Sequence, residues 1–495
     1  MSDFSKLTIP EIARGLRSHD FTVAELVEFY LNKINARNHE INAFLEIYND
    51  LESQIAKAQK RIDAGEEGMM IGIPVAIKDN ILVEGKLASA SSKVLENYKA
   101  TYTATAAQKL IDAGAILIGR TNMDEFAMGG STENSAYMIT KNPVNPEYVP
   151  GGSSGGSTAA VAMGGVPVAL GSDTGGSIRQ PASFCGVVGL KPTYGSVSRH
   201  GLMAMASSLD VIGPLARNVS DAEIVFNVIK GQDPKDATSI SYDEKNSDSS
   251  KKTENLDGEE KVENSSDDEK PIVKTIGVPT SFLKEGVDEP VINRFNESIA
   301  RLKSEGYEIK EIDLPNLKYS LAVYYILMPA EVSSNMARFD GIKYGPKIEG
   351  ENLIEGYFKT RGQLIGKEVK RRIMLGTYVL SAGYADQYYK KAWQVRNLIS
   401  RDFQKAFESV DVIAMPTSPT PAFKIGEKST DPLEMYLADI FTISANLAGI
   451  PAISIPDGTV SKNGVDLPVG MQFLATHKRE DKLFELGKKF EIIKA

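Results

Sequence analysis

The chain has 495 residues, 42% of them hydrophobic, which is enough for two to four ordinary domains or for one large α/β unit. Its 65 acidic residues outnumber its 56 lysines and arginines and give a net charge of −9, which disfavours a broad surface for nucleic-acid phosphates. A single cysteine excludes an intrachain disulfide, and four scattered histidines argue against a zinc site, so a reducing cytoplasm is the expected location.

The N-terminal region is predicted to begin with amphipathic helices. Thr22 and Glu25 form the pattern of a capping box, and the apolar residues that follow fall on one helix face. From residue 71 the pattern changes to short apolar strands that alternate with helices. These are a strand over 71–77, a helix around 104–113 and a strand over 115–119. This alternation is typical of βαβ units.

Two runs of glycine and serine follow, at 151–157 and 171–177. The first lacks the Gly-Lys-Ser/Thr ending of a nucleotide-binding loop, so nucleotide binding is disfavoured there. In the second, flexible residues before Ser177 let successive N–H groups point to one spot, as an oxyanion hole requires. The longest apolar stretch, 158–170, is interrupted by glycines and a proline, so no membrane span is expected.

A nucleophilic Ser177 needs a base, and no histidine of this chain lies in a suggestive setting. Lys78 ends an apolar strand, where burial lowers the pKa of a lysine toward neutrality and yields a free-amine base. Each feature also has a plainer interpretation. Taken alone, a lysine such as Lys78 is more often an ordinary charge at the end of a strand, and glycine–serine runs are more often turns.

The alternation of strands and helices resumes in the second half of the chain. A strand is predicted over 275–278, a helix ends at Gly306, and further strands are predicted over 307–312 and 411–415. Because the unit recurs on both sides of the middle, the sequence predicts one large mixed α/β domain over 1–495.

One segment, 243–270, is predicted to be a disordered acidic insert in that domain. It contains eleven acidic residues and five lysines but only Leu256 and Val262 as sizeable apolar residues. Its net charge of −6 leaves the rest of the chain near −3. The insert is either an interaction tail or a tolerated expansion of a surface loop, since long loops close at little cost.

Three segments together resemble the fingerprint of the amidase signature family. They are Lys78-Asp79-Asn80, the loop 151–157 and the segment 171–193, which contains Asp-Thr-Gly-Gly-Ser-Ile-Arg. The resemblance implies an α/β fold with a large mixed β-sheet core that is covered by helices on both faces.

The same resemblance implies a Ser-cisSer-Lys triad. In it Ser177 is the nucleophile, Ser153 is the bridging serine and Lys78 is the base. It also implies an oxyanion hole formed by the backbone N–H groups of Thr174, Gly175 and Gly176. Cys185 has apolar flanks and no plausible histidine partner, so it is predicted to be a core residue and not a nucleophile.

Four other stretches narrow the resemblance within this family, to the A subunits of glutamyl-tRNA(Gln) amidotransferases. These stretches are 121–134, 338–345, 366–373 and 431–436.

In that subfamily, the resemblance implies that Arg372 holds the α-carboxylate of glutamine and that Asp439 holds its α-amine. A guanidinium matches a carboxylate with two hydrogen bonds, and a carboxylate accepts from an ammonium. The chain departs from the pattern at 327–329, Leu-Met-Pro, where small residues are usual. This stretch lies beside Tyr324 and Tyr325, and which tyrosine contacts substrate stays open.

The resemblance implies a glutaminase subunit that hydrolyses glutamine and supplies ammonia for the conversion of Glu-tRNA(Gln) to Gln-tRNA(Gln). It implies partner B and C subunits, with ATP and Mg on the B subunit, whereas no cofactor or metal is expected on this chain. Contact with Glu-tRNA(Gln) is expected through the complex and not chiefly through this chain. The alternatives are a free-standing amidase acting on another small amide and an inactive scaffold subunit, which the three intact triad positions disfavour.

Overall fold

The structure, a computed structural model, describes residues 3–242, 273–283, 286–428 and 432–493. The segment 243–270, predicted to be a disordered insert, lies outside the described residues. The strands in chain order are β1 (Phe44–Ile47), β2 (Pro74–Lys78), β3 (Ile116–Thr121), β4 (Val168–Asp173), β5 (Val188–Lys191), β6 (Val211–Ala216), β7 (Thr275–Val278), β8 (Glu308–Glu311), β9 (Val412–Pro416), β10 (Ala452–Lys462) and β11 (Val465–Leu474).

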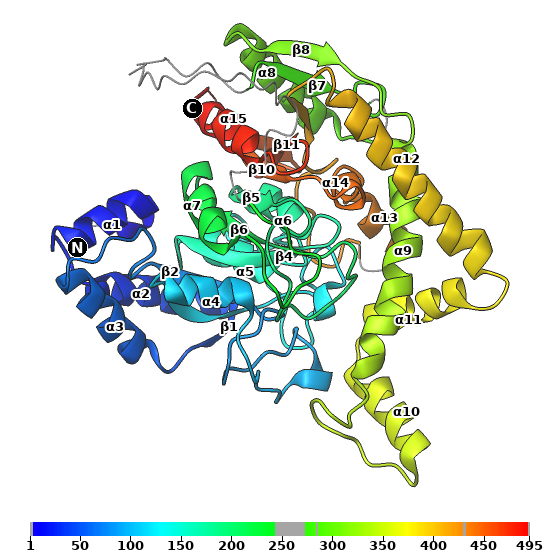
Figure 1. Ribbon diagram of the computed structural model, residues 1–495, viewed down its shortest axis with the longest axis horizontal. Coiled ribbons are helices and arrows are strands. Elements are labelled where there is room, and N and C mark those ends of the chain that lie inside the picture. The colour runs from blue at the N-terminus through cyan, green and yellow to red at the C-terminus, as the bar shows by residue number, and fades with distance from the viewer. Residues whose placement is uncertain (1–2, 243–272, 284–285, 429–431, 494–495) are drawn as a thin grey trace, which may run out of the picture.

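Within the described ranges, all eleven strands belong to one sheet, in the order β1-β3-β2-β4-β6-β5-β10-β11-β9-β7-β8 (Figure 1). The strands β3, β2 and β4 are parallel to one another, as are β9, β7 and β8, and the strands between these groups pair antiparallel. The predicted large mixed sheet is therefore confirmed. Every residue of β2 is buried, which is typical of a central strand covered on both faces.

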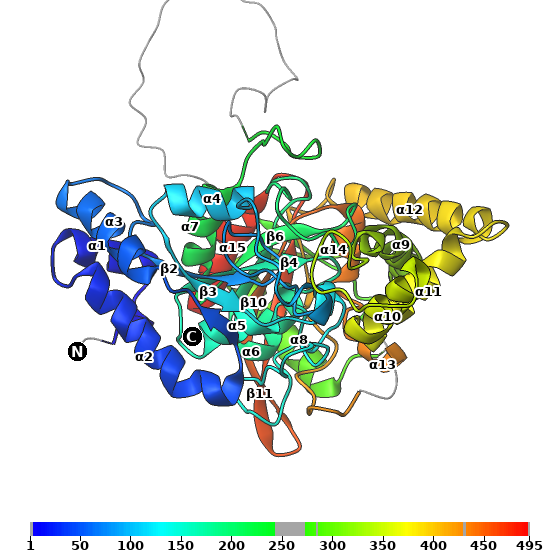
Figure 2. The same ribbon diagram turned by 90° about the horizontal axis from the view of Figure 1, so that it is seen from below.

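Helices cover the sheet and extend beyond it. They are α1 (Ile9–Arg17), α2 (Val23–Ile41), α3 (Leu51–Asp63), α4 (Thr105–Asp112), α5 (Gly155–Ala162), α6 (Arg179–Cys185), α7 (Val219–Ile229), α8 (Glu289–Ser304), α9 (Ser320–Asn335), α10 (Leu353–Leu364), α11 (Lys367–Leu380), α12 (Lys390–Ala406), α13 (Pro432–Leu437), α14 (Ile443–Ala448) and α15 (Glu480–Ile493). Figure 2 shows α4 and α7 on one side of the sheet and α5 and α6 on the other. No helix within the described part is long and apolar enough to cross a bilayer.

The predicted local signals agree with the observed elements. Thr22 and Glu25 form the capping box that opens α2, and the strand predicted over 275–278 is β7. The strand predicted over 71–77 is β2, which begins later, at Pro74, because Gly72 has a positive φ in a turn where the Ile73 N–H donates to the Met70 carbonyl.

The helices α9 to α12 form an extended group beside the sheet, which the sequence reasoning did not predict (Figure 1). Within it, α11 lies directly against the backbone of α9. A Cβ on Gly376 would overlap with the carbonyl oxygen of Pro329, so glycine is required for this approach. The position of α11 matters for function because it carries Arg372.

Candidate active site

Lys78 is the last residue of β2, and its side chain is fully buried. Its amine donates to Ser153 Oγ and Ser154 Oγ, at 2.8 Å each, and to Ser172 Oγ at 2.9 Å. Burial lowers the pKa of this amine from its ordinary 10.5 to about 7, although nearby carboxylates such as Asp124 favour the charged form. Lys78 therefore carries an amine that is largely neutral at mildly alkaline pH, within hydrogen-bond reach of Ser153.

Ser153 and Ser154 lie in the loop that leads into α5. The peptide bond between Gly152 and Ser153 is cis. The Gly152 N–H donates to Gln180 Oε1 at 3.0 Å, and the Ser154 N–H donates to the Ser177 carbonyl at 3.1 Å. These two bonds fasten the first glycine–serine run to the second, so the segments that carry Ser153 and Ser177 lie side by side.

Asp173 organises the turn that leads from β4 to Ser177. Its carboxylate accepts from the N–H of Gly176 at 2.9 Å and from the N–H of Ile178 at 3.2 Å. Arg179 donates twice to the same carboxylate, at 3.0 Å each. Burial by itself raises the pKa of Asp173, but the Arg179 guanidinium outweighs it and lowers the pKa to about 2. The carboxylate is thus charged at neutral pH and fixes the turn through backbone hydrogen bonds.

The Arg179 guanidinium also ties this turn to the C-terminal part of the chain. It donates to the Thr442 carbonyl at 2.9 Å, to Gln472 Oε1 at 2.6 Å and to Asn446 Oδ1 at 2.6 Å. Arg179 and Asp173 are both fully buried. Their positions are therefore set by the ion pair between them and by hydrogen bonds to protein groups, and not by contacts with water.

The predicted oxyanion donors differ in their availability. The N–H of Gly176 is occupied, because it donates to Asp173. Within the described part of the chain, the N–H groups of Thr174, Gly175 and Ser177 make no hydrogen bond. Two of the three predicted donors are therefore free in this structure, and the N–H of Ser177 is a further free donor at the same turn.

Arg372 is buried on α11, 4% exposed, among aromatic rings. Its guanidinium centre lies 5.7 Å from the Tyr325 ring and 5.6 Å from the Tyr436 ring, and these two rings stack on each other. Its Nε donates to Glu368 Oε1 at 2.8 Å, and the Tyr436 hydroxyl donates to the same oxygen at 3.0 Å. One terminal nitrogen approaches Met328 Sδ at 3.7 Å, so the unusual 327–329 stretch borders the arginine.

Asp439 lies beside the turn before Ser177 and interacts electrostatically with Arg372. A Cβ on Gly176 would lie 3.3 Å from Asp439 Oδ1. Burial raises the pKa of Asp439 to about 8, and the charge of Arg372 opposes this rise. Tyr324 packs over the same turn, because a Cβ on Gly175 would lie 2.7 Å from its ring. Of the two tyrosines left open by the sequence, Tyr324 is therefore the one in contact with the turn.

A cavity of about 410 Å³ adjoins this arrangement. Its walls include Arg372, Glu368 and Tyr436, together with Ser131 and Met435. The cavity does not reach the triad positions themselves. It therefore leads toward the Arg372 guanidinium and not directly to Ser177, which is 8% exposed.

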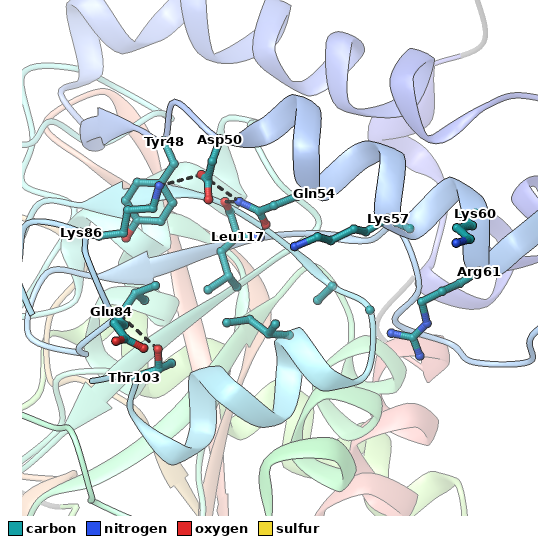
Figure 3. A pocket seen from close by; sticks show the side chains of 15 residues that line it. Tyr48, Asp50, Gln54, Lys57, Lys60, Arg61, Glu84, Lys86, Thr103 and Leu117 are labelled. Atoms are coloured by element: carbon teal, nitrogen blue, oxygen red, sulfur yellow. Dashed lines mark hydrogen bonds and ion pairs between the residues drawn. The ribbon is translucent and has the colours of Figure 1, made fainter. Parts of the chain in front are cut away.

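A cavity of about 520 Å³ lies elsewhere, between α3 and the start of β3 (Figure 3). The Lys57 and Lys60 side chains lie along it, and Lys86 donates to Asp50 at 2.7 Å. None of the predicted site residues lines this cavity, and the described residues of its walls include no serine or cysteine. It is accordingly not the site of the predicted amide chemistry.

Cys185 is buried at the end of α6 and its thiol donates to the Pro150 carbonyl at 3.4 Å. Burial raises the pKa of this thiol well above its ordinary value. A thiol in this setting stays protonated, which agrees with its predicted place in the core.

Glu368 and Tyr436 hold the Arg372 side chain and were not among the site residues predicted from the sequence. Glu368 precedes Arg372 by four residues, a spacing at which side chains on one helix face meet, so a local signal for this pair was present. Tyr436 contacts Glu368 across 68 positions of sequence, and no local pattern indicates that contact.

Comparison with known protein families gives a match to the amidase family model, over residues 25–484. The chain is 51% identical over 488 residues to the glutamyl-tRNA(Gln) amidotransferase A subunit of Thermoanaerobacter pseudethanolicus, with 98% of this chain and 96% of that protein covered. It is 49% identical over 490 residues to the protein of the same name from Thermodesulfovibrio yellowstonii, with 99% and 97% covered.

Among solved structures, the chain is similar to the crystal structure of the glutamyl-tRNA(Gln) amidotransferase A subunit from Thermotoga maritima. The TM-score is 0.75 at 40% identity, with 98% of this chain and 94% of that chain covered. The likeness therefore extends over the whole sheet and its helices and is not confined to the site.

Proposed function

The chain belongs to the amidase family, and we propose that it is the glutamine-hydrolysing subunit of a tRNA-dependent amidotransferase. The observation that carries the proposal is the fully buried Lys78 amine, with a pKa of about 7, at 2.8 Å from Ser153 Oγ. Relatives named as the A subunit of glutamyl-tRNA(Gln) amidotransferase support the choice of reaction, since they match over nearly the whole length of the chain.

In the proposed acylation step, Ser177 Oγ attacks the side-chain carbonyl carbon of glutamine. The serine proton passes through the Ser153 hydroxyl to the neutral Lys78 amine, and the carbonyl oxygen becomes an oxyanion. Free N–H groups at Thr174 and Gly175 lie at the turn where that charge develops. When the tetrahedral intermediate collapses, the C–N bond breaks, the proton held by Lys78 goes to the nitrogen, and ammonia leaves.

In the deacylation step, water attacks the glutamyl ester of Ser177. Lys78, neutral again, accepts the water proton through Ser153 and returns it to Ser177 Oγ as the ester C–O bond breaks. The products of the two steps are glutamate and ammonia, and the enzyme returns to its starting state.

Arg372 and Asp439 are proposed to bind the two charged ends of glutamine. A buried guanidinium whose Nε is held by Glu368 keeps its terminal N–H groups for a substrate carboxylate. Asp439, close to Gly176, offers a carboxylate to the substrate ammonium. Because burial keeps the pKa of Asp439 near 8, an arriving ammonium also favours the charged form of this carboxylate.

The ammonia is proposed to pass to a partner B subunit, in a complex that also contains a C subunit. That partner is proposed to bind ATP and Mg and to convert Glu-tRNA(Gln) to Gln-tRNA(Gln), whereas this chain needs no cofactor of its own. The division agrees with a chain whose net charge is −9, which is unfavourable for a broad contact with tRNA.

Co-expression of the chain with candidate B and C subunits tests the proposal. We expect glutamate release from glutamine, and formation of Gln-tRNA(Gln) when Glu-tRNA(Gln) and ATP are supplied. A chain that hydrolyses uncharged amides as readily as glutamine, and that forms no Gln-tRNA(Gln) with any partner, is instead a free-standing amidase.

A further inference from the structure

Glu125 is a buried carboxylate that the proposed reaction does not use. It opens a short helical turn, η3 (Glu125–Ala127), and is 2% exposed. Its Oε1 accepts from the Ser92 hydroxyl, and its Oε2 accepts from the backbone N–H of Gly366 at 2.7 Å. The second bond connects a loop beside the triad to α11, which begins at the next residue after Gly366.

The other side of the Glu125 segment reaches Ser153. The N–H of Asp124 donates to the Ser153 carbonyl at 3.3 Å. The Asp124 carboxylate accepts from the N–H groups of Thr132 and Asn134, at 2.9 and 3.1 Å, so its loop is closed on itself. Adjacent residues thus contact the bridging serine on one side and the start of α11 on the other.

The contact with Gly366 is close and electrostatically favourable. A Cβ at position 366 would overlap with Glu125 Oε2, so the carboxylate approaches the helix only because the residue is glycine. The first N–H groups of a helix have no partner within it and carry partial positive charge, which a carboxylate stabilises. Arg372 follows Gly366 by six residues, within the second turn of the same helix.

We propose that Glu125 is a positioning residue: it fixes the N-terminus of α11, and through it the Arg372 guanidinium, relative to the segment that carries Ser153. This inference rests on the proposed function, because it takes Arg372 to hold the carboxylate of glutamine. Loss of the contact lets α11 shift on α9, which displaces the guanidinium while Lys78 and Ser153 keep their own hydrogen bonds. The consequence is weaker binding of glutamine at an unchanged rate of amide chemistry.

The test compares Glu125→Gln with the wild-type full chain, assembled with its partner subunits, on glutamine and on propionamide at about pH 9. At this pH Lys78, Glu125 and Asp439 are mostly in their deprotonated forms. We expect the KM for glutamine to rise about three- to tenfold, with kcat for glutamine and kcat/KM for propionamide within about twofold of wild type. Gly366→Ala perturbs the same contact from the other side. It should likewise raise the KM for glutamine and leave kcat for glutamine and kcat/KM for propionamide unchanged, so it provides the test if Glu125→Gln fails to fold.

Glu480→Gln is the matched control. Glu480 is equally buried, at 2% exposed, and accepts from the Thr193 N–H and the Tyr242 hydroxyl, far from α11. It should leave both substrates unaffected. The positioning role would be overturned if the glutamine KM were unchanged in Glu125→Gln and Gly366→Ala, or if these variants lost activity equally on both substrates. It would also be overturned if Glu480→Gln raised the glutamine KM to the same extent. A wild-type enzyme that does not prefer glutamine to propionamide contradicts the proposed function instead, so the two failures are distinguishable.

Discussion

Replacing Lys78 by arginine removes the proposed base and places a permanent positive charge at the end of β2. With a pKa of about 7, about nine-tenths of the amine is neutral at about pH 8, against less than about one in a hundred at the ordinary pKa of 10.5. A guanidinium stays protonated throughout this range and accepts no proton. Because a positioned base contributes about 10²- to 10⁴-fold, the Lys78→Arg enzyme should lose amide hydrolysis by at least about 100-fold.

The assay is the initial rate of ammonia release from propionamide as a function of pH. An uncharged amide does not depend on Asp439, whose own titration near pH 8 would otherwise enter the profile. The amine must lose its proton before it accepts one from serine, so the wild-type rate should rise with pH through about 7.

Lys191→Arg is the matched control for Lys78→Arg. Lys191 is also fully buried at the end of a strand, and burial likewise lowers its pKa to about 7, but its amine donates to the Pro192 carbonyl and, among the described residues, to no serine. Both substitutions place a guanidinium in a buried lysine site, so both lower the melting temperature, whereas only Lys78→Arg should remove the rate. Retention of more than about 1% of the wild-type rate by Lys78→Arg, or a wild-type profile that is flat through pH 7, would refute the role of Lys78 as base.

Further substitutions and a deletion test the nucleophile, the substrate-binding residues and the acidic segment. Ser177→Ala should remove glutaminase activity and leave folding and partner assembly unchanged, and turnover above about 1% of wild type would exclude Ser177 as nucleophile. Arg372→Ala should raise the KM for glutamine about ten-fold to over a hundred-fold, because a charge-assisted contact is lost, and Asp439→Asn should have a similar effect. Equal losses of activity on propionamide would mean that these residues only maintain the structure. Deletion of 245–268 should leave the melting temperature and the amidase rate unchanged, because that sequence has too few apolar residues to pack, and a drop of more than a few degrees would contradict this.

The residues around Lys78 and Ser177 were predictable because their signals are local. The two signals are a continuous apolar strand that ends in lysine and a run of glycines that precedes a serine. Each can be recognised within a few positions of the sequence. The strands β2 and β7 and the capping box of α2 were predictable for the same reason.

The supports of the site were not predictable from local patterns. Arg179 reaches Thr442, Asn446 and Gln472, whose positions differ from its own by more than 260 residues. The roles of Arg372 and Asp439 came from a family resemblance alone. The burial of Arg372 and the partial burial of Asp439 depend on packing between α9, α11 and the C-terminal segment. A propensity or a periodicity carries no information on contacts of this range.

Mass spectrometry of the glutamyl-enzyme identifies the residue that attacks glutamine. The full chain in its complex is mixed with glutamine, quenched within the first turnover and digested, and the peptide that carries a glutamyl group is sequenced. We expect the glutamyl ester on Ser177, and its absence from Ser177→Ala. A glutamyl group on Ser153 or Cys185, or continued turnover by Ser177→Ala, would contradict it.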